Sequence, residues 1–514
     1  PAVKDYVYNS SNGALTIMGK NVTITSTKLN GADTIRNLTV NNGVQDFTLE
    51  GITITGITTI NGGSSNSIHF KDCQLQGQVI LNKQDVHIAL EGSTSVSKEV
   101  IVQAPAALSV AETVSITETI QAQADLTVRT GTVPEVQVTK QAVVTTQTGA
   151  NIAAVEVATT APVTVNAAVE TVKVSEAGAA VTIESAVKNV SVTQPATVTV
   201  AAGGAVTTVA AAVDNGKVTV TGNGTVDNVV ATTVNTVTVA ETVKPAIGTE
   251  VTVSNDAKKI TLTVNGGDVM TTLPAAAKQN TEVSFTVVPK TGYEITSVLH
   301  GGSVLTATGD VYSFTMGNAD TTVTINTATQ PKWTDNGVPA GLTASEITAA
   351  GTTYTTTLTG STTAAIENAE GQLFAGVDNK NNKFAQCVID LGGLAEGTTY
   401  TITQTNDALN EAYPGDFTEG KKVKDYSGAD IKDGIAFLVW QEHGGTITFK
   451  IEANNTVIRT ITITNNTTAQ PVDVTATVTA EEGKGLTCAD TTISGYFTGA
   501  LEQSLFNKAA KTAD

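Results

Sequence analysis

A short apolar-polar-apolar motif that recurs at nearly constant spacing constrains the fold of this chain most. Six such segments, rich in Val and Thr, begin 8, 9, 9, 9 and 8 residues apart, at 155–157, 163–165, 172–174, 181–183, 190–192 and 198–200. This alternation is typical of strands with one buried face. The connections lack the Asn-Gly and Asp-Gly turns of tight hairpins, and their small residues suit the corners of a coil that stacks on itself.

Two strands per coil give a rung of 17 to 18 residues, in which equivalent side chains stack in inward ladders. The side chains expected to face inward are Val163, Val165, Val181, Ile183, Val198 and Val200. We therefore predict an all-β fold in which residues 1–249 form a parallel β-solenoid with an N-terminal strand segment. An antiparallel sandwich remains the alternative, because four Asn-Gly pairs in the first hundred residues also suit hairpins.

Three segments of the solenoid region resemble those of secreted Gram-positive surface proteins that often carry S-layer homology modules. They are residues 61–70 (Asn-Gly-Gly-Ser-Ser-Asn-Ser-Ile-His-Phe), 86–94 (Val-His-Ile-Ala-Leu-Glu-Gly-Ser-Thr) and 98–102 (Lys-Glu-Val-Ile-Val). The resemblance implies an extracellular, cell-surface location. It does not extend to an S-layer homology module, so attachment through such a module is not implied.

Residues 250–330 have a different sequence pattern, in which predicted strands are separated by Gly-containing turns. A Gly-Gly turn at 266–267, Gly292-Tyr293 and the segment 312–316 (Tyr-Ser-Phe-Thr-Met) follow in that order. This order resembles the internalin B-repeat, a bacterial surface module. The resemblance implies a small β-rich repeat module that acts as a spacer or an interaction module.

Residues 331–470 hold both tryptophans and six predicted strands, a pattern typical of a β-sandwich. Residues 471–514 form a separate C-terminal strand and tail. The strand at 472–478 places Val472, Val474, Ala476 and Val478 on one side. Pro471 separates this strand from the sandwich, because proline cannot donate to a β-ladder.

The charge of the chain excludes some classes of partner. The formal net charge is -19, from 29 basic and 48 acidic side chains, and only Arg36, Arg129 and Arg459 are arginines. Nucleic acid and anionic membranes are therefore poor partners. No run of 18 apolar residues is present, so we expect no membrane span.

The three cysteines lie far apart and form no Cys-x-x-Cys pair, which excludes a structural zinc site of that type. Cys387 and Cys488 could form one disulfide, leaving Cys73 single. Three buried free thiols are the equally weighted alternative.

Residues that could carry catalysis or bind a metal are sparse. The four histidines, His69, His87, His300 and His443, are scattered along the sequence, and residues 150–250 contain no Arg to act as the base of a pectate-lyase-like site. We therefore expect no enzymatic activity and no cofactor, with a polysaccharide lyase as the third-ranked function. Calcium is the one metal considered, and its candidate ligands are Asp425, Asp430 and Asp433.

The aromatic residues of the third region could bind glycans or fill a core. They are Trp333, Tyr354, Tyr400, Tyr413, Tyr426 and Trp440. Burial in the sandwich is the favoured interpretation.

The function expected from these features is that of an extracellular structural protein that assembles with copies of itself into a surface layer or fibre. No cap is evident at the first strands, and an open solenoid end can template pairing with another chain. Residues 472–478 are the leading candidate for the strand that a subunit adds to its neighbour, and residues 1–8 are the next. The alternative is a surface adhesin that binds cell-wall or host glycans and uses the solenoid as a stalk.

Overall fold

The computed structural model describes residues 4–362, 384–406, 423–441, 444–468, 478–481 and 485–488. This part of the chain is all-β, with 56% of the described residues in strands. It divides into two compact units, Pro1–Thr327 and Ala328–Asp514, and each is described by itself.

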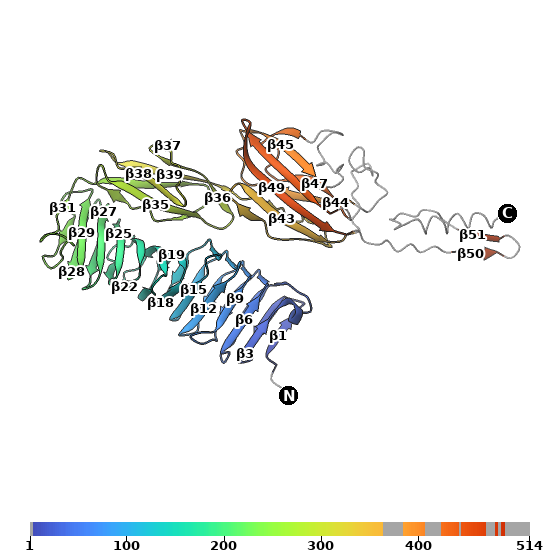
Figure 1. Ribbon diagram of the computed structural model, residues 1–514, viewed down its shortest axis with the longest axis horizontal. Coiled ribbons are helices and arrows are strands. Elements are labelled where there is room, and N and C mark those ends of the chain that lie inside the picture. The colour runs from blue at the N-terminus through green and yellow to red at the C-terminus, as the bar shows by residue number, and fades with distance from the viewer. Residues whose placement is uncertain are drawn as a thin grey trace. The chain divides into compact units, whose positions relative to one another are not determined.

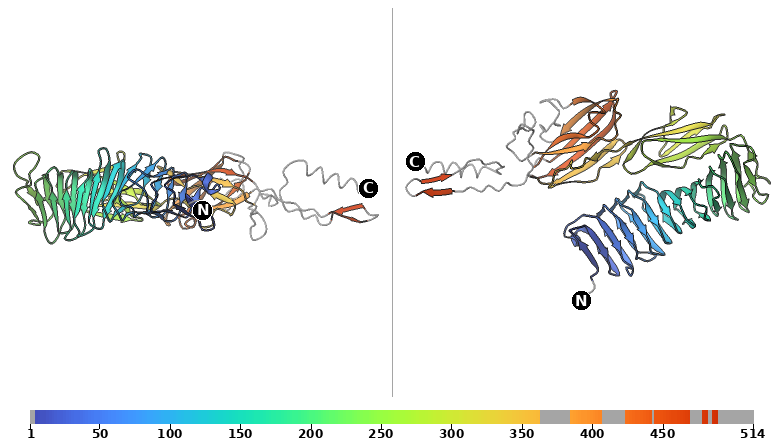
Figure 2. Two further views of the ribbon diagram at one scale, coloured as in Figure 1. Left: turned by 90° about the horizontal axis from the view of Figure 1, so that it is seen from below. Right: turned by 180° about the vertical axis from the view of Figure 1, so that it is seen from behind.

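The first unit begins with the predicted parallel β-solenoid of about 12 turns. Figure 1 shows its strands side by side in a row from the blue N-terminal part to the green part, and Figure 2 shows this row from two further sides. Two long sheets run along the row. Sheet A contains, in spatial order, β1 (Tyr6–Asn9), β2 (Ala14–Ile17), β5 (Asn37–Val40), β8 (Thr58–Ile60), β11 (Val79–Leu81), β14 (Val100–Val102), β17 (Ile120–Ala122), β19 (Thr132–Val138), β21 (Asn151–Val157), β23 (Val169–Val174), β25 (Ala186–Val192), β27 (Ala205–Ala211), β29 (Thr225–Ala231) and β31 (Val253–Ser254). Sheet B contains β3 (Asn21–Ile24), β6 (Asp46–Glu50), β9 (Ile68–Lys71), β12 (Val86–Glu91), β15 (Ala106–Val110), β18 (Leu126–Thr130), β20 (Ala142–Thr146), β22 (Val163–Asn166), β24 (Ala180–Ile183), β26 (Ala196–Val200), β28 (Val218–Gly222) and β30 (Val237–Val239).

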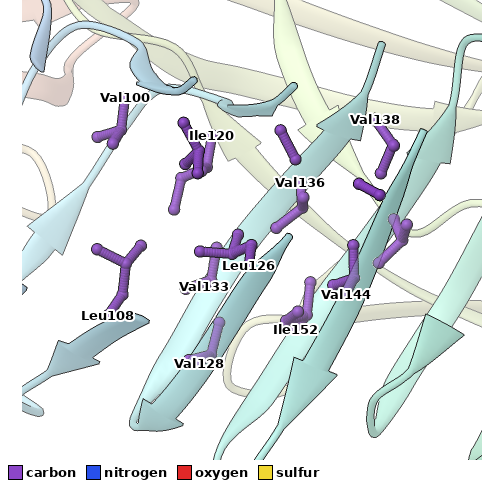
Figure 3. Packing of buried hydrophobic residues seen from close by; sticks show 14 of the residues in the cluster. Val100, Leu108, Ile120, Leu126, Val128, Val133, Val136, Val138, Val144 and Ile152 are labelled. Atoms are coloured by element: carbon purple, nitrogen blue, oxygen red, sulfur yellow. The ribbon is translucent and has the colours of Figure 1, made fainter. Parts of the chain in front are cut away.

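The core of the solenoid lies between sheets A and B. Figure 3 shows part of it, where apolar side chains of the two sheets, such as Ile120 and Leu126, point into the interior. The ladders predicted from the sequence are confirmed: Val163, Val181 and Val198 are partners on successive rungs, and so are Val165, Ile183 and Val200. All six side chains are buried.

The first rungs have a third side that was not predicted. Sheet C consists of five two-residue strands: β4 (Thr34–Ile35), β7 (Thr53–Ile54), β10 (Gln74–Leu75), β13 (Ser95–Val96) and β16 (Ser115–Ile116). It ends at β16, and the following rungs have two sheets only. The solenoid therefore changes from a three-sided to a two-sided cross-section.

The N-terminal end of the solenoid is capped, contrary to the expectation of an open first rung. Strand β1 folds back antiparallel on β2, and the hydroxyl of Tyr6 donates to the carbonyl of Lys28 at 2.9 Å. A short 3-10 turn, η1 (Ser26–Leu29), places Leu29 in the core with 1% of its surface exposed. The cap closes the interior but leaves one edge of β1 without a partner strand among the described residues.

A small β-rich module follows the solenoid in the same unit. One of its sheets contains β34 (Ala276–Ala277), β32 (Lys258–Asn265), β39 (Thr321–Thr329), β36 (Tyr293–His300) and β37 (Ser303–Val304). The other contains β33 (Val269–Thr271), β35 (Glu282–Pro289) and β38 (Val311–Thr315). Both sheets contribute side chains to one apolar cluster.

The module packs on the outer face of sheet A. The hydroxyl of Thr171 donates to the carbonyl of Thr272 at 2.8 Å, and the amide of Ala275 donates to the hydroxyl of Ser191 at 2.9 Å. Thr171 is fully buried, as is Ala154, which occupies the equivalent position on the preceding rung. The module therefore forms a second layer over this part of the solenoid.

The second unit has two sheets that share one apolar cluster. The smaller sheet contains β40 (Lys332–Trp333), β44 (Phe384–Asp390) and β47 (Ile435–Trp440). The larger contains β41 (Leu342–Ala344), β42 (Thr348–Ala350), β43 (Thr353–Gly360), β49 (Thr456–Thr467), β48 (Thr446–Ala453), β45 (Thr399–Asn406) and β46 (Val423–Ser427). Strands β50 (Val478–Glu481) and β51 (Gly485–Cys488) pair with each other. The β-sandwich expected for residues 331–470 stays a prediction.

Two of the three thiols lie in the apolar cores. Cys73 and Cys387 are buried and free, so the possible disulfide from Cys387 is not formed. Burial raises the pKa of the Cys73 thiol to about 11 and that of the Cys387 thiol to about 12. Both therefore behave as inert core residues.

Candidate functional site

The outer face of sheet B brings together side chains that the sequence separates. His69 on β9 and His87 on β12 lie on neighbouring rungs, because His69 is the register partner of Ala89, two residues after His87. Ser109 lies one rung further, on β15. The inward positions of these strands are occupied by apolar residues, so these three side chains project outward.

His69 belongs to a polar ladder on this face. Its Nδ1 lies 3.1 Å from Oε1 of Glu91, and Nζ of Lys71 lies 2.8 Å from Oε1 of Glu50 on the neighbouring strand. All four side chains are partly exposed. Exposed pairs of this kind contribute little to stability.

His87 differs from His69 because it is buried although it points outward, with 8% of its surface exposed. Its Nε2 lies 2.8 Å from Oγ of Ser109, whereas its Nδ1 is buried without a hydrogen-bond partner. Burial, assisted by the positive charge of Arg129, lowers the pKa of His87 to about 4. The imidazole is therefore neutral at pH 7.

The His87–Ser109 pair has part of the geometry of an activated nucleophile. In such sites a third group orients the imidazole through its second nitrogen. Here that nitrogen has no partner, and a pKa of about 4 makes the imidazole a weak base at neutral pH. We assign the pair no catalytic role.

A groove of about 470 Å³ lies beside His87 on the same face. Its lining residues are Ser65, Asp85, Val86, Pro105, Ala106, Ala107, Asp125, Thr127, Arg129 and Gln147. Ala107, the register partner of His87, and Val86, which precedes His87, both line the groove, whereas His87 itself does not. Its lining combines polar side chains with small apolar ones.

A loop at residues 61–67 covers part of this face. The carbonyl of Ser64 accepts from the amide of His87 at 3.0 Å, and the carbonyl of Ser65 accepts from Nη1 of Arg129 at 2.9 Å. Within the loop, the buried Ser67 hydroxyl donates to the carbonyl of Ser64 at 2.8 Å. The loop thus reaches from the rung of β9 to that of β18.

A second set of polar groups lies where the small module meets sheet A. Nζ of Lys290 lies 3.8 Å from the carboxylate of Glu118, whose pKa is raised by burial. Lys173 and Glu135 form a 2.8 Å ion pair on the outer face of sheet A. The Lys290–Glu118 contact joins the module to the solenoid, whereas the Lys173–Glu135 pair lies within sheet A, and we assign both a structural role.

The aspartates considered for calcium are not brought into a metal site. Asp425 lies on β46, where its Oδ1 accepts from the hydroxyl of Thr401 at 2.6 Å, and Asp430 and Asp433 follow in an exposed turn. Within the described residues, no group of three or more His, Cys, Asp or Glu side chains is placed to hold a metal ion.

The other predicted site residues divide between the described and the undescribed parts of the chain. Val472, Val474 and Ala476 lie outside the described residues, and Val478 begins β50. Of the aromatic candidates, Tyr354, Tyr400 and Tyr426 are buried, as expected for core residues. Trp333 is partly buried against that core, Tyr413 lies outside the described residues, and only the backbone of Trp440 is described.

Sequence reasoning missed the groove because it treated the histidines as scattered. The available signal was a second spacing: the segments 79–81 and 100–102 are 21 residues apart, and the structure pairs them on adjacent rungs. The strands of sheet B repeat at 20 residues, as in His69 with Ala89 and Ala89 with Ser109, and extending that spacing would have placed His69, His87 and Arg129 on one face.

Among the residues that the structure describes, no helix is long and apolar enough to cross a membrane. In comparisons with family models, curated proteins and solved structures, none matches this chain.

Proposed function

We propose that this chain is a structural component of an extracellular surface layer or fibre, whose copies associate by adding a β-strand to the edge of sheet A. One observation carries the proposal: β1 is the terminal strand of a 14-stranded sheet, and it is paired on one side only within the described residues. Its Val7 side chain is 44% exposed.

The hydrogen-bonding pattern identifies the groups at this edge. The amide of Met18 donates to the carbonyl of Asp5 at 2.8 Å, so Asp5 and Val7 direct their backbone groups toward β2. In an antiparallel pair the intervening residues direct theirs the other way. The N–H and C=O groups of Tyr6 and Tyr8 therefore face the unpaired edge.

An unpaired edge of this kind is a template for another strand. Backbone hydrogen bonds give affinity, and the alternating side chains of the added strand give specificity. Residues 472–478 have that alternation, and Pro471 precedes them. They remain the favoured donor, while the extracellular location and the non-enzymatic role rest on the sequence resemblance and the composition described above.

The first test changes the edge and leaves the core intact. Lysine on an edge strand opposes pairing because its charge would be buried against the incoming strand. We expect Val7→Lys to raise the concentration needed for assembly at least tenfold, measured by electron microscopy and sedimentation of the full chain. The matched control is Val143→Lys, since Val143 is also exposed but lies on β20, which has a partner strand on each side.

Equal assembly of the two variants would refute the role of β1. A chain that ends at Thr468 tests the donor separately: we expect it to remain monomeric and folded. Polymers that persist in this shortened chain would exclude residues 472–478 as the donor.

A further inference from the structure

Arg129 in the groove of sheet B has an unused binding capacity. It is one of only three arginines in the chain and projects outward from β18. Nη1 donates to the carbonyl of Ser65, which fixes the orientation of the guanidinium. Within the described residues Arg129 forms no ion pair, although Asp85 and Asp125 line the same groove. The remaining N–H groups are a planar fork suited to a carboxylate.

The rest of the groove suits a hydroxylated ring. Asp85, Asp125 and Gln147 offer oxygen acceptors for hydroxyl groups, and one oxygen of Asp125 already accepts from the amide of Val143 at 2.8 Å. This contact holds the Asp125 side chain in place. Pro105 and Ala107 supply a small apolar surface on which the C–H face of a ring can pack.

We propose that the groove binds a carboxylated saccharide, in which Arg129 holds the carboxylate of a uronic acid and Asp85 and Asp125 accept from ring hydroxyls. The mixture of one arginine with two carboxylates favours a sugar over an acidic peptide. The ring hydroxyl groups beside the carboxylate of a uronate can donate to Asp85 and Asp125, whereas the side chains of an acidic peptide offer no such donors. The inference goes beyond the assembly role, because it concerns a ligand and a face of the solenoid that strand addition does not use.

The test is calorimetric titration of the full chain with four probes: a galacturonic acid trimer, its methyl ester, a hyaluronan tetrasaccharide and triglutamate. At least one of the two uronate oligosaccharides should bind. If the galacturonate trimer binds, its neutral methyl ester should bind at least tenfold more weakly, and triglutamate should not bind. Binding by neither uronate oligosaccharide would overturn the proposal. Equal binding of triglutamate would identify an acidic-peptide site instead and would also overturn it.

Two variants locate the site. Arg129→Gln should weaken binding of the uronate at least tenfold, while Arg36→Gln, the same change outside the groove, should not. Because Arg129 also anchors the loop at 61–67, Thr127→Trp provides a second probe that fills the groove and keeps the arginine. It should abolish binding as well. Uronate binding that survives Thr127→Trp would place the site elsewhere and refute the assignment.

Discussion

Burial controls how His87 responds to acid. The folded chain keeps this imidazole neutral down to about pH 4, whereas the unfolded chain protonates it near the ordinary pKa of 6.5. Between these values the unfolded state binds more protons, so the free energy of unfolding falls as the pH falls. The loss from this one side chain is at most about 3 kcal/mol.

We expect His87→Gln to remove this pH dependence. Urea unfolding of the wild type and the variant at pH 7 and pH 4.5 measures it, and the wild type should lose more stability on acidification. Glu118, whose pKa burial raises, contributes in the opposite direction but equally in both proteins, so the difference between them isolates His87. Identical losses in the two proteins would show that His87 is not buried as a neutral group.

At the scale of elements, the corners between strands limit the side chains that the solenoid tolerates. A Cβ on Gly77, in the corner between β10 and β11, would lie 1.9 Å from the carbonyl oxygen of Gly56 on the preceding rung. Neither atom belongs to a flexible side chain, so the backbone of two rungs would have to move. The corner therefore requires glycine because of a close approach between rungs.

Gly77→Ala should destabilise the solenoid by about 1–3 kcal/mol, within the range of overpacked sites. Both tryptophans lie in the second unit, so tryptophan fluorescence reports on that unit, while far-UV circular dichroism reports on the whole chain. The variant should lower the dichroism midpoint and leave the fluorescence midpoint unchanged. Gly317→Ala is the control, since nothing lies within 4 Å of its added Cβ.

Elements with a regular spacing in the sequence could be predicted, and elements without one could not. The two-sided rungs were predicted because Val163, Val181 and Val198 recur at a nearly constant interval, at equivalent positions of successive strands of sheet B. Sheet C was not predicted, because its strands have only two residues, as in Gln74–Leu75. So short a segment shows no repeated alternation of apolar and polar residues. The groove was missed for a related reason: its residues come from five rungs and meet only when the register is known.

At the scale of the first unit, the small module buries outward-facing side chains of sheet A and so limits their size. Ala154 would face solvent in an isolated solenoid but has no exposed surface here, because the rungs of β19 and β21 contact β33 of the module. The alternation of buried and exposed residues is therefore lost on these rungs. Small side chains such as Ala154 allow the two layers to approach.

Ala154→Glu should separate the layers, since it would bury an unpaired charge between them. Hydrogen exchange measures the effect: amides of β33 should exchange at least tenfold faster, while those of β21 keep their protection. Thr59→Glu is the control, because Thr59 is an outward position of sheet A that remains partly exposed. Unchanged exchange in β33 would show that the module is not held through this face.

The pairing of β32 with β39 has a mechanical consequence. The chain enters the module at the start of β32 and leaves it at the end of β39, and these strands are parallel over six residue pairs, from Ile260 with Thr321 to Asn265 with Asn326. Tension carried along the backbone would therefore pull the two strands past each other lengthwise. All of their hydrogen bonds would share the load, instead of opening one after another as in a zipper. The module would therefore resist mechanical unfolding when the chain is pulled from both ends.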